Sequence, residues 1–207
     1  MLKMKMALVI FDGMTVLDLI GWYDAVTQIK RFQPSLALSW DLCAMTDEVK
    51  DDRGLIMRSH QVRPDLSDYD LVFVPGGGAT RQLKDDSDFI SWLQTAEEAA
   101  YKISVCTGAL LLGAAGFLSG KRATTNPSAY KLLVPYCEEV VHARIVRDGM
   151  TITAGGVAAS IDLGLYVVEM LTDRDTAEQI QRSMDYPYYV SGQTDGDYVI
   201  NFQSDRN

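Results

Sequence analysis

The sequence predicts an α/β fold in which helices cover both faces of a mainly parallel sheet. Short apolar runs alternate along the chain with longer amphipathic stretches, which is the expected order of strands and helices in such a fold. Several runs are apolar throughout, as strands buried on both faces are. The 207 residues are expected to form one domain, because chains tend to split only beyond roughly 250 residues.

Apolar or alternating segments mark the predicted strands. In chain order they are Ala7–Phe11, Leu36–Ala44, a segment within Gly54–Val62, Leu71–Val74, Ile103–Val105, Val140–Val146 and Met150–Thr153. Asp148-Gly149 lies between the last two strands and is typical of a hairpin turn, so these strands are expected to pair with each other.

Helical spacing of apolar residues marks the predicted helices. They are Val16–Lys30, with Thr15 as N-cap, Ser87–Tyr101, Thr107–Phe117, Val157–Leu171 and Asp173–Ser183. The domain is assigned to residues 1–185. Residues 186–207 lack periodicity, and they are expected to form an irregular tail or to pack on a partner.

Composition narrows the classes of function. The chain has 19 Lys and Arg against 28 Asp and Glu, a net charge of −9, whereas nucleic-acid binders usually carry a basic face. No apolar run approaches the roughly 20 residues that span a bilayer, so no membrane partner is expected. Three cysteines without paired spacing favour a reducing compartment, taken here as the cytoplasm. His60 and His142 are too few and too far apart to predict a histidine metal site.

Three signals follow predicted strands and are expected to converge, because ligands bind beyond the carboxyl ends of such strands. They are Asp12-Gly13, Gly76-Gly77-Gly78 and Cys106-Thr107-Gly108. Glycines after a strand let backbone N–H groups face a ligand, so Gly77 and Gly78 are candidate oxyanion-hole residues. A plain flexible turn is the alternative for this glycine run.

Cys106 is the strongest candidate for a catalytic residue. It ends an apolar strand and opens a helix, which is the layout of a nucleophile elbow, and a helix N-terminus favours a thiolate. The alternative is a buried, inert cysteine, which is the interpretation for Cys43 and Cys137. Asp18 lies among apolar residues, where burial would keep it protonated and able to donate to the thiolate; helix capping is its alternative role.

At these residues the chain resembles the ThiJ/PfpI superfamily, relatives of the class I glutamine amidotransferases, and within it the isonitrile hydratases. The matching stretches occur in order over about residues 6–185. They are LDLIG at 17–21, DLVFVPGGG at 70–78, SVCTGALLLGAA at 104–115, GKRATT at 120–125, RDG at 147–149 and TAGGVAASIDL at 153–163.

The resemblance implies a flavodoxin-like three-layer sandwich, often a homodimer, with Cys106 as nucleophile and its thiolate paired with Asp18. Thr107 matches the residue after the nucleophile, which the isonitrile hydratases use in catalysis, and Gly77 and Gly78 match the oxyanion-hole region. It predicts a lyase that needs no metal or organic cofactor. The Cys106 thiolate would attack the terminal carbon of a small-molecule isonitrile while Asp18 supplies a proton. Water would then convert the thioimidate into an N-substituted formamide.

Two other functions fit the same residues. A glyoxalase-like or other hydrolytic enzyme acting on small carbonyl compounds would use Cys106 and Asp18 with a different pocket. A redox-sensing stress-response protein would instead be oxidised at Cys106. Superfamily members with peptidase activity have His directly after the Cys, where this chain has Thr107. In the isonitrile hydratases His-Trp is expected after Ala-Thr-Thr, where this chain has Asn126-Pro127, and this difference is expected to bear on the substrate.

Overall fold

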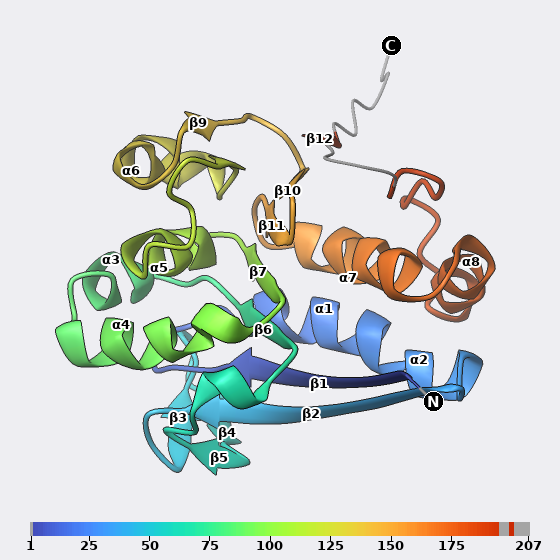
Figure 1. Cartoon of the computed structure of the whole chain (residues 1–207), viewed down its shortest axis with the longest axis horizontal. Helices are drawn as coiled ribbons and strands as arrows, with labels where there is room; N and C mark the ends of the chain where they lie inside the picture. The colour runs from blue at the N-terminus through green and yellow to red at the C-terminus, as the bar shows by residue number, and fades with distance from the viewer. Residues whose placement is uncertain (1, 195–198, 201–207) are drawn as a thin grey trace.

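One eight-stranded sheet forms the centre of the molecule (Figure 1). The structure is a computed structural model that describes residues 2–194 and 199–200. The strands of the sheet are β1 (Leu2–Val9), β2 (Leu36–Ala44), β5 (Gln61–Val62), β6 (Leu71–Val74), β7 (Tyr101–Val105), β10 (Ile145–Asp148), β11 (Thr151–Ala154) and β12 (Val199–Ile200). In space they follow the order β12-β10-β11-β7-β6-β1-β2-β5.

The sheet is mainly parallel, as the sequence predicts. β1 pairs in parallel with β2 and β6, β6 pairs with β7, and β7 pairs with β11. β10 and β11 are antiparallel, with Asp148 opposite Thr151 across the turn, which confirms the predicted hairpin. Two small pairs lie outside the sheet. They are β3 (Glu48–Lys50) with β4 (Ile56–Arg58), and β8 (Arg122–Ala123) with β9 (Glu139–Val140).

Helices cover both faces of this sheet (Figure 1). The group of α1, α2, α7 and α8 covers one face, and the group of α3, α4 and α5 covers the other, where α6 packs on α5. Their bounds are α1 (Val16–Thr27), α2 (Ile29–Phe32), α3 (Thr80–Leu83), α4 (Ser87–Gln94), α5 (Gly108–Ala114), α6 (Tyr130–Leu133), α7 (Ala159–Leu171) and α8 (Arg174–Ser183). Among the described residues, no helix is both long and apolar enough to pass through a membrane.

The predicted helix Ser87–Tyr101 is wrong at its C-terminal end. α4 ends at Gln94, a 3₁₀ turn follows, and Tyr101 already belongs to β7. The side chain of Thr95 explains this end, because its hydroxyl donates to the carbonyl oxygen of Trp92 (2.7 Å) and accepts from the Leu66 N–H (3.0 Å). Such local bonds compete with the helical pattern.

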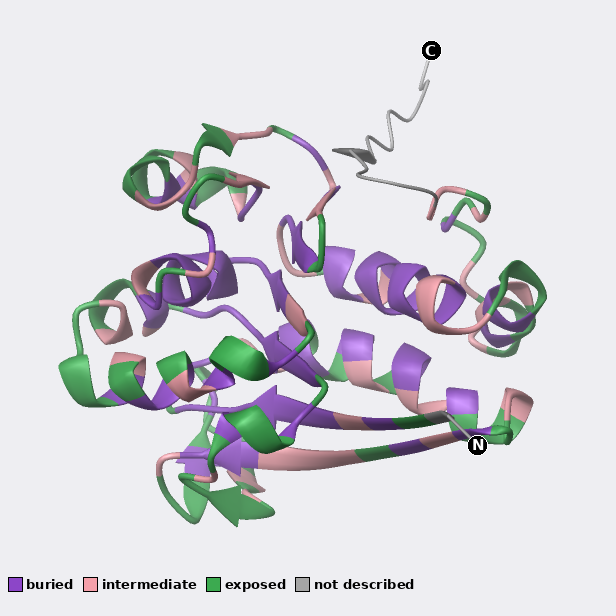
Figure 2. Ribbon diagram, viewed as in Figure 1, coloured by how far each residue is buried: buried purple, intermediate pink, exposed green. Residues whose placement is uncertain are grey.

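The core lies between the sheet and the two helical layers, where buried residues line the inner faces (Figure 2). The indole of Trp22 on α1 stacks on the ring of Phe73 on β6, with centroids 4.3 Å apart, and both residues are fully buried. α1 also packs on α7 at two glycines, Gly21 and Gly164. A Cβ atom at Gly164 would lie 2.7 Å from the Cβ of Ala25, so these helices pack too closely for a larger side chain there.

The tail packs back on the domain in the part that the structure describes. Residues 186–194 form no helix or strand, as expected of an irregular segment. Tyr189 is nevertheless buried, and its hydroxyl donates to Glu169 on α7 (2.7 Å). Val199 and Ile200 form β12 and pair with β10, which an irregular tail would not do. The other tail residues, 195–198 and 201–207, lie outside the described part.

Replacing Gly164 tests the close approach of α1 and α7. Gly164→Ala is expected to lower the free energy of unfolding by about 1–3 kcal/mol, because the added methyl overpacks the contact with Ala25. Urea unfolding measures the change. Combining it with Ala25→Gly removes the methyl that the new one meets, so the double variant should lose less stability than the sum of the single losses. Strictly additive losses would contradict this contact.

Candidate active site

Cys106 lies on a sharp turn between β7 and α5, as the sequence predicts. Its φ angle is 55°, in the left-handed region that a residue with a side chain rarely adopts, at a cost of order 1–3 kcal/mol. The surrounding backbone holds this conformation. The Cys106 N–H donates to the carbonyl oxygens of Ala154 (3.0 Å) and Gly155 (2.8 Å), and its own carbonyl accepts from the Thr125 hydroxyl (2.7 Å).

Asp18 projects from the first turn of α1 and is fully buried. One carboxylate oxygen, Oδ2, accepts from the Gly76 N–H (2.9 Å). The other oxygen, Oδ1, is buried without a hydrogen-bond partner among the described residues. The carboxyl group therefore binds the glycine turn after β6 and does not cap its own helix.

Burial raises the pKa of Asp18 to about 7, and the nearby charge of Asp52 adds to this rise. The Gly76 N–H and the Cys106 thiol oppose it, because both favour the carboxylate. Burial also raises the pKa of Cys106 to about 11, and the charge of Asp18 adds to that rise. The two groups interact, so their protons belong to the pair rather than to either residue alone.

The three predicted signals meet at this point. Thr15, after the Asp12-Gly13 turn, donates its N–H to the Gly76 carbonyl (2.9 Å), and Met14 forms a bridge with Gly77. Gly76 in turn lies against the candidate nucleophile, because a Cβ atom there would lie 2.8 Å from the Cβ of Cys106 and 2.5 Å from the Thr107 nitrogen. The site is thus assembled from the ends of β1, β6 and β7.

Thr107 and the glycine run are fastened to each other. The Gly77 N–H donates to the Thr107 hydroxyl (3.0 Å), and the hydroxyl donates to the Gly77 carbonyl (3.0 Å). Of the two predicted oxyanion donors, the Gly77 N–H is therefore already bonded to Thr107 and is not free for a substrate. Gly78 has no acceptor for its N–H among the described residues, and a Cβ atom there would meet nothing within 4 Å. The backbone N–H of Thr107 faces the Cys106 sulfur and favours its thiolate.

Asn126 is a neighbour of the nucleophile that sequence reasoning treated only as a family difference. Its side-chain Nδ2 lies 3.6 Å from the Cys106 sulfur, within hydrogen-bond range for sulfur. The signal in the sequence is its position directly after the Ala123-Thr124-Thr125 motif. The structure shows why this position is near the sulfur, because the Thr125 hydroxyl donates to the Cys106 carbonyl. The histidines do not join the site by any described contact: His142 stacks on Tyr130, and His60 accepts from the Leu42 N–H.

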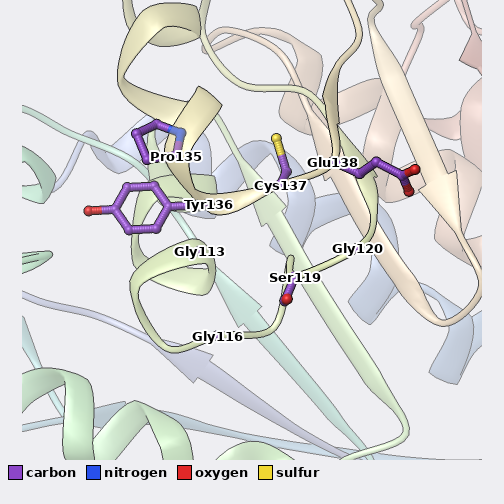
Figure 3. Close-up of a pocket in the computed structure, with 8 residues that line it drawn as sticks. All are labelled: Gly113, Gly116, Ser119, Gly120, Pro135, Tyr136, Cys137 and Glu138. Atoms are coloured by element: carbon purple, nitrogen blue, oxygen red, sulfur yellow. The ribbon is translucent and has the colours of Figure 1, made fainter.

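The other cysteines lie away from this site. Cys43 is buried, and its sulfur contacts the Tyr69 hydroxyl (3.5 Å). Cys137 borders a cavity of about 260 Å³ beside the end of α5 (Figure 3), where its thiol donates to the Leu133 carbonyl (3.6 Å) and burial raises its pKa. Within the described residues, no three His, Cys, Asp or Glu side chains are grouped to hold a metal ion.

Residues 4–170 match the DJ-1/PfpI family, and the chain belongs to this family. The matched range includes Asp18, the glycine run, Cys106 and Asn126. Membership confirms the ThiJ/PfpI resemblance drawn from the motifs.

Individual relatives agree with this assignment. The chain is 34% identical over 198 residues to an isonitrile hydratase from Pseudomonas putida, a match that covers 94% of this chain and 85% of the relative. A Parkinson disease protein 7 homolog from Danio rerio is 29% identical over 116 residues, covering 55% of this chain and 61% of that protein.

Solved structures have the same sandwich. A THiJ/PfpI family protein from Pseudomonas syringae superposes with a TM-score of 0.83 at 30% identity, covering 95% of this chain and 80% of that one. DJ-1beta of Drosophila melanogaster gives a TM-score of 0.77 at 20% identity, over 91% of this chain and 100% of that one, and shows the shared fold. These likenesses confirm the flavodoxin-like sandwich.

The buried Asp18 should make stability depend on pH. The unfolded chain releases the Asp18 proton near pH 4, whereas the folded chain keeps it until about pH 7, so folding loses stability as the pH rises between these values. Asp18→Asn removes this loss. The free energy of unfolding of Asp18→Asn, relative to that of the unmodified protein, should rise by up to about 4 kcal/mol between pH 4 and pH 8.

Urea unfolding at a series of pH values measures this difference. Asp24→Asn is the matched control, because it removes an exposed carboxyl from the same helix and leaves the buried one in place. A difference between Asp18→Asn and the unmodified protein that does not change with pH would show that folding does not raise the pKa of Asp18.

Proposed function

We propose that this chain is an isonitrile hydratase-like enzyme, which adds water to an isonitrile and releases an N-substituted formamide. The observation that carries the proposal is the buried pair of Cys106, on a strained strand-to-helix turn, and Asp18, whose pKa is raised to about 7. The similarity to the isonitrile hydratase over almost the whole chain supports this choice of substrate class.

The first step uses the proton that the pair holds at neutral to alkaline pH. When this proton is on Asp18, the Cys106 sulfur is a thiolate and can act as a nucleophile. The sulfur forms a bond to the terminal carbon of R–N≡C, and the Asp18 proton goes to the same carbon. The product is a thioimidate, R–N=CH–S–Cys106, with Asp18 left as a carboxylate.

The second step returns the pair to its starting state. Asp18 takes a proton from water as the water oxygen bonds to the thioimidate carbon, and passes this proton to the substrate nitrogen. The C–S bond then breaks while the hydroxyl proton moves to Asp18. This releases R–NH–CHO and restores the thiolate and the protonated acid. The Gly78 N–H would stabilise charge that develops on the substrate.

Formamide release from cyclohexyl isocyanide tests the proposal. The unmodified protein should turn it over, and Cys106→Ala and Asp18→Asn should each lose activity by about 10³-fold or more, because each removes a reacting group. Cys137→Ala is the matched control and should keep full activity, since Cys137 lies beside the separate cavity at α5.

Other results would favour the alternatives. Substantial turnover by Cys106→Ala would rule out the covalent mechanism. Hydroxy acid formed from a dicarbonyl, with no formamide from isonitriles, would support the carbonyl-directed enzyme. Addition of two oxygens to Cys106 by mild peroxide, in a protein without either activity, would support redox sensing.

The reaction should depend on pH through the same pair. The singly protonated pair reacts, so kcat/KM should rise as the pH passes about 7 and fall as it approaches about 11. Initial rates of formamide release across this range give the profile. Rates that instead fall as the pH rises through 7 would assign the activity to the doubly protonated pair.

A homodimer belongs to the same proposal. Leu17 and Ile20 on α1 and Leu55 and Ile56 in the β3–β4 hairpin are large apolar residues, each 44–56% exposed. The hairpin is tied to the start of α1 by the hydrogen bond from the Thr15 hydroxyl to Asp52 (3.0 Å). A second copy of the chain would cover this apolar face beside the site.

A further inference from the structure

The side chain of Asn126 is held in one orientation beside the Cys106 sulfur. Its oxygen, Oδ1, accepts from both the N–H (3.0 Å) and the hydroxyl (2.8 Å) of Ser128. Because Oδ1 is occupied in this way, the amide presents its other end, the Nδ2 donor, to the sulfur at 3.6 Å. The contact is thus a donated hydrogen bond, which a thiolate accepts better than a thiol does.

The backbone around Asn126 favours the same arrangement. Pro127 follows it and restricts the preceding residue to extended conformations, and Asn126 has φ −55° and ψ 135°. In this conformation its side chain caps the 3₁₀ turn Pro127–Ala129. Gly156 leaves the space that the amide occupies, because a Cβ atom there would lie 2.6 Å from Nδ2.

A cation lies at the outer end of this chain of hydrogen bonds. Arg81 on α3 donates from Nη2 to the Ser128 hydroxyl (3.3 Å), and it forms no ion pair within the described residues. The series runs from Arg81 through Ser128 and Asn126 to the Cys106 sulfur. Each donor polarises the next, which strengthens the last bond toward a negatively charged sulfur.

Other groups around the pair also affect whether the shared proton is on Asp18 or on Cys106. The Gly76 N–H donates to its carboxylate and so favours the form in which the shared proton is on the sulfur. Asp52, in the β3–β4 loop, repels the Asp18 carboxylate and favours the protonated acid. The Thr107 N–H, at the start of α5, favours the thiolate. Among the described residues, Asn126 is the one side chain that donates a hydrogen bond to the Cys106 sulfur and so also favours the thiolate.

We infer that Asn126 is a positioning residue for the nucleophile: its amide, fixed by Ser128 and Arg81, moves the proton of the Asp18–Cys106 pair toward Asp18 and so raises the fraction of the sulfur that is thiolate. This rests on Cys106 as the nucleophile of the proposed function, but not on isonitriles as its substrate. The family difference at Asn126-Pro127 then concerns the reactivity of the sulfur.

The test measures the thiol itself, without any isonitrile. The rate of Cys106 alkylation by iodoacetamide is followed from pH 6 to 10, with peptide mass spectrometry to separate Cys106 from Cys43 and Cys137. Asn126→Asp keeps an acceptor for Ser128 but replaces the donor by a negative charge. At pH 8 its alkylation rate should fall by about 10-fold or more, the size expected for losing a hydrogen bond to a charged group. Asn126→Ala, which lacks both, should also be slowed.

Two further variants distinguish this role from helix capping. Asp65→Ala removes a cap of the same kind, since Asp65 accepts from the Ser67 N–H at another 3₁₀ turn. It should lower stability without changing Cys106 alkylation. Gly156→Ala keeps the Asn126 side chain, but the added methyl would displace its Nδ2 from the sulfur, so this variant should also slow alkylation of Cys106.

A folded Asn126→Asp protein whose alkylation profile matches that of the unmodified protein would overturn the inference. So would an equal slowing by Asp65→Ala. Loss of isonitrile turnover with an unchanged alkylation profile would also overturn it, because Asn126 would then act on the substrate. Conversely, a protein that fails to hydrate isonitriles but shows the expected alkylation changes would refute the substrate class and leave this inference standing.

Discussion

The hydrogen bond from the Gly76 N–H to the buried Asp18 carboxylate joins the parts on which the site depends. It ties the first turn of α1 to the turn after β6, and Gly76 packs directly on the backbone of Thr107. A carboxyl group in this position is costly to ionise, because it is removed from water and one of its oxygens has no described partner. Burial of this carboxyl group therefore lowers stability, and the proposed reaction would give the group its role.

Both groups of the candidate site are therefore held in states that are costly in isolation. Cys106 has a left-handed backbone, and Asp18 is buried with a raised pKa. The surrounding structure holds them in place, and the packing around Asp18 includes the Trp22–Phe73 stack and the close contact of α1 with α7. Rigid packing on two elements fixes the separation of the two groups, which a loop would not do as well.

Much of the fold could be predicted from the sequence because the apolar pattern is strong where strands are buried on both faces. Leu36–Ala44 and Leu71–Val74 have the bounds that the sequence predicts. β1 begins at Leu2, earlier than predicted. Lys3 and Lys5 interrupt the apolar pattern there, so the sequence does not mark this part of the strand. The Thr95 hydroxyl that ends α4 bonds locally to Trp92, but it also accepts from Leu66, 29 positions away, and no local pattern encodes this second bond.

The site shows the same limit. Cys106 and Asp18 stand out in the sequence because each has an unusual local setting. The Thr107 hydroxyl bonds to Gly77, and the Asn126 amide lies beside Cys106. Both contacts join residues that are distant in the chain and adjacent in space. The sequence predicts Cys106 and Asp18 as the reacting residues, and the structure adds the residues that hold them in place.

The pairing of β12 with β10 has a consequence for how the protein behaves among other proteins. A sheet's outermost strand carries unpaired backbone groups that can recruit a strand from another molecule. Here the end of the chain supplies that strand itself, so β10 is protected on its outer side by Val199 and Ile200. β12 thereby covers the backbone of Ile145 and Val146, and a cleavage that removed β12 would leave these backbone groups free to pair with a strand of another molecule.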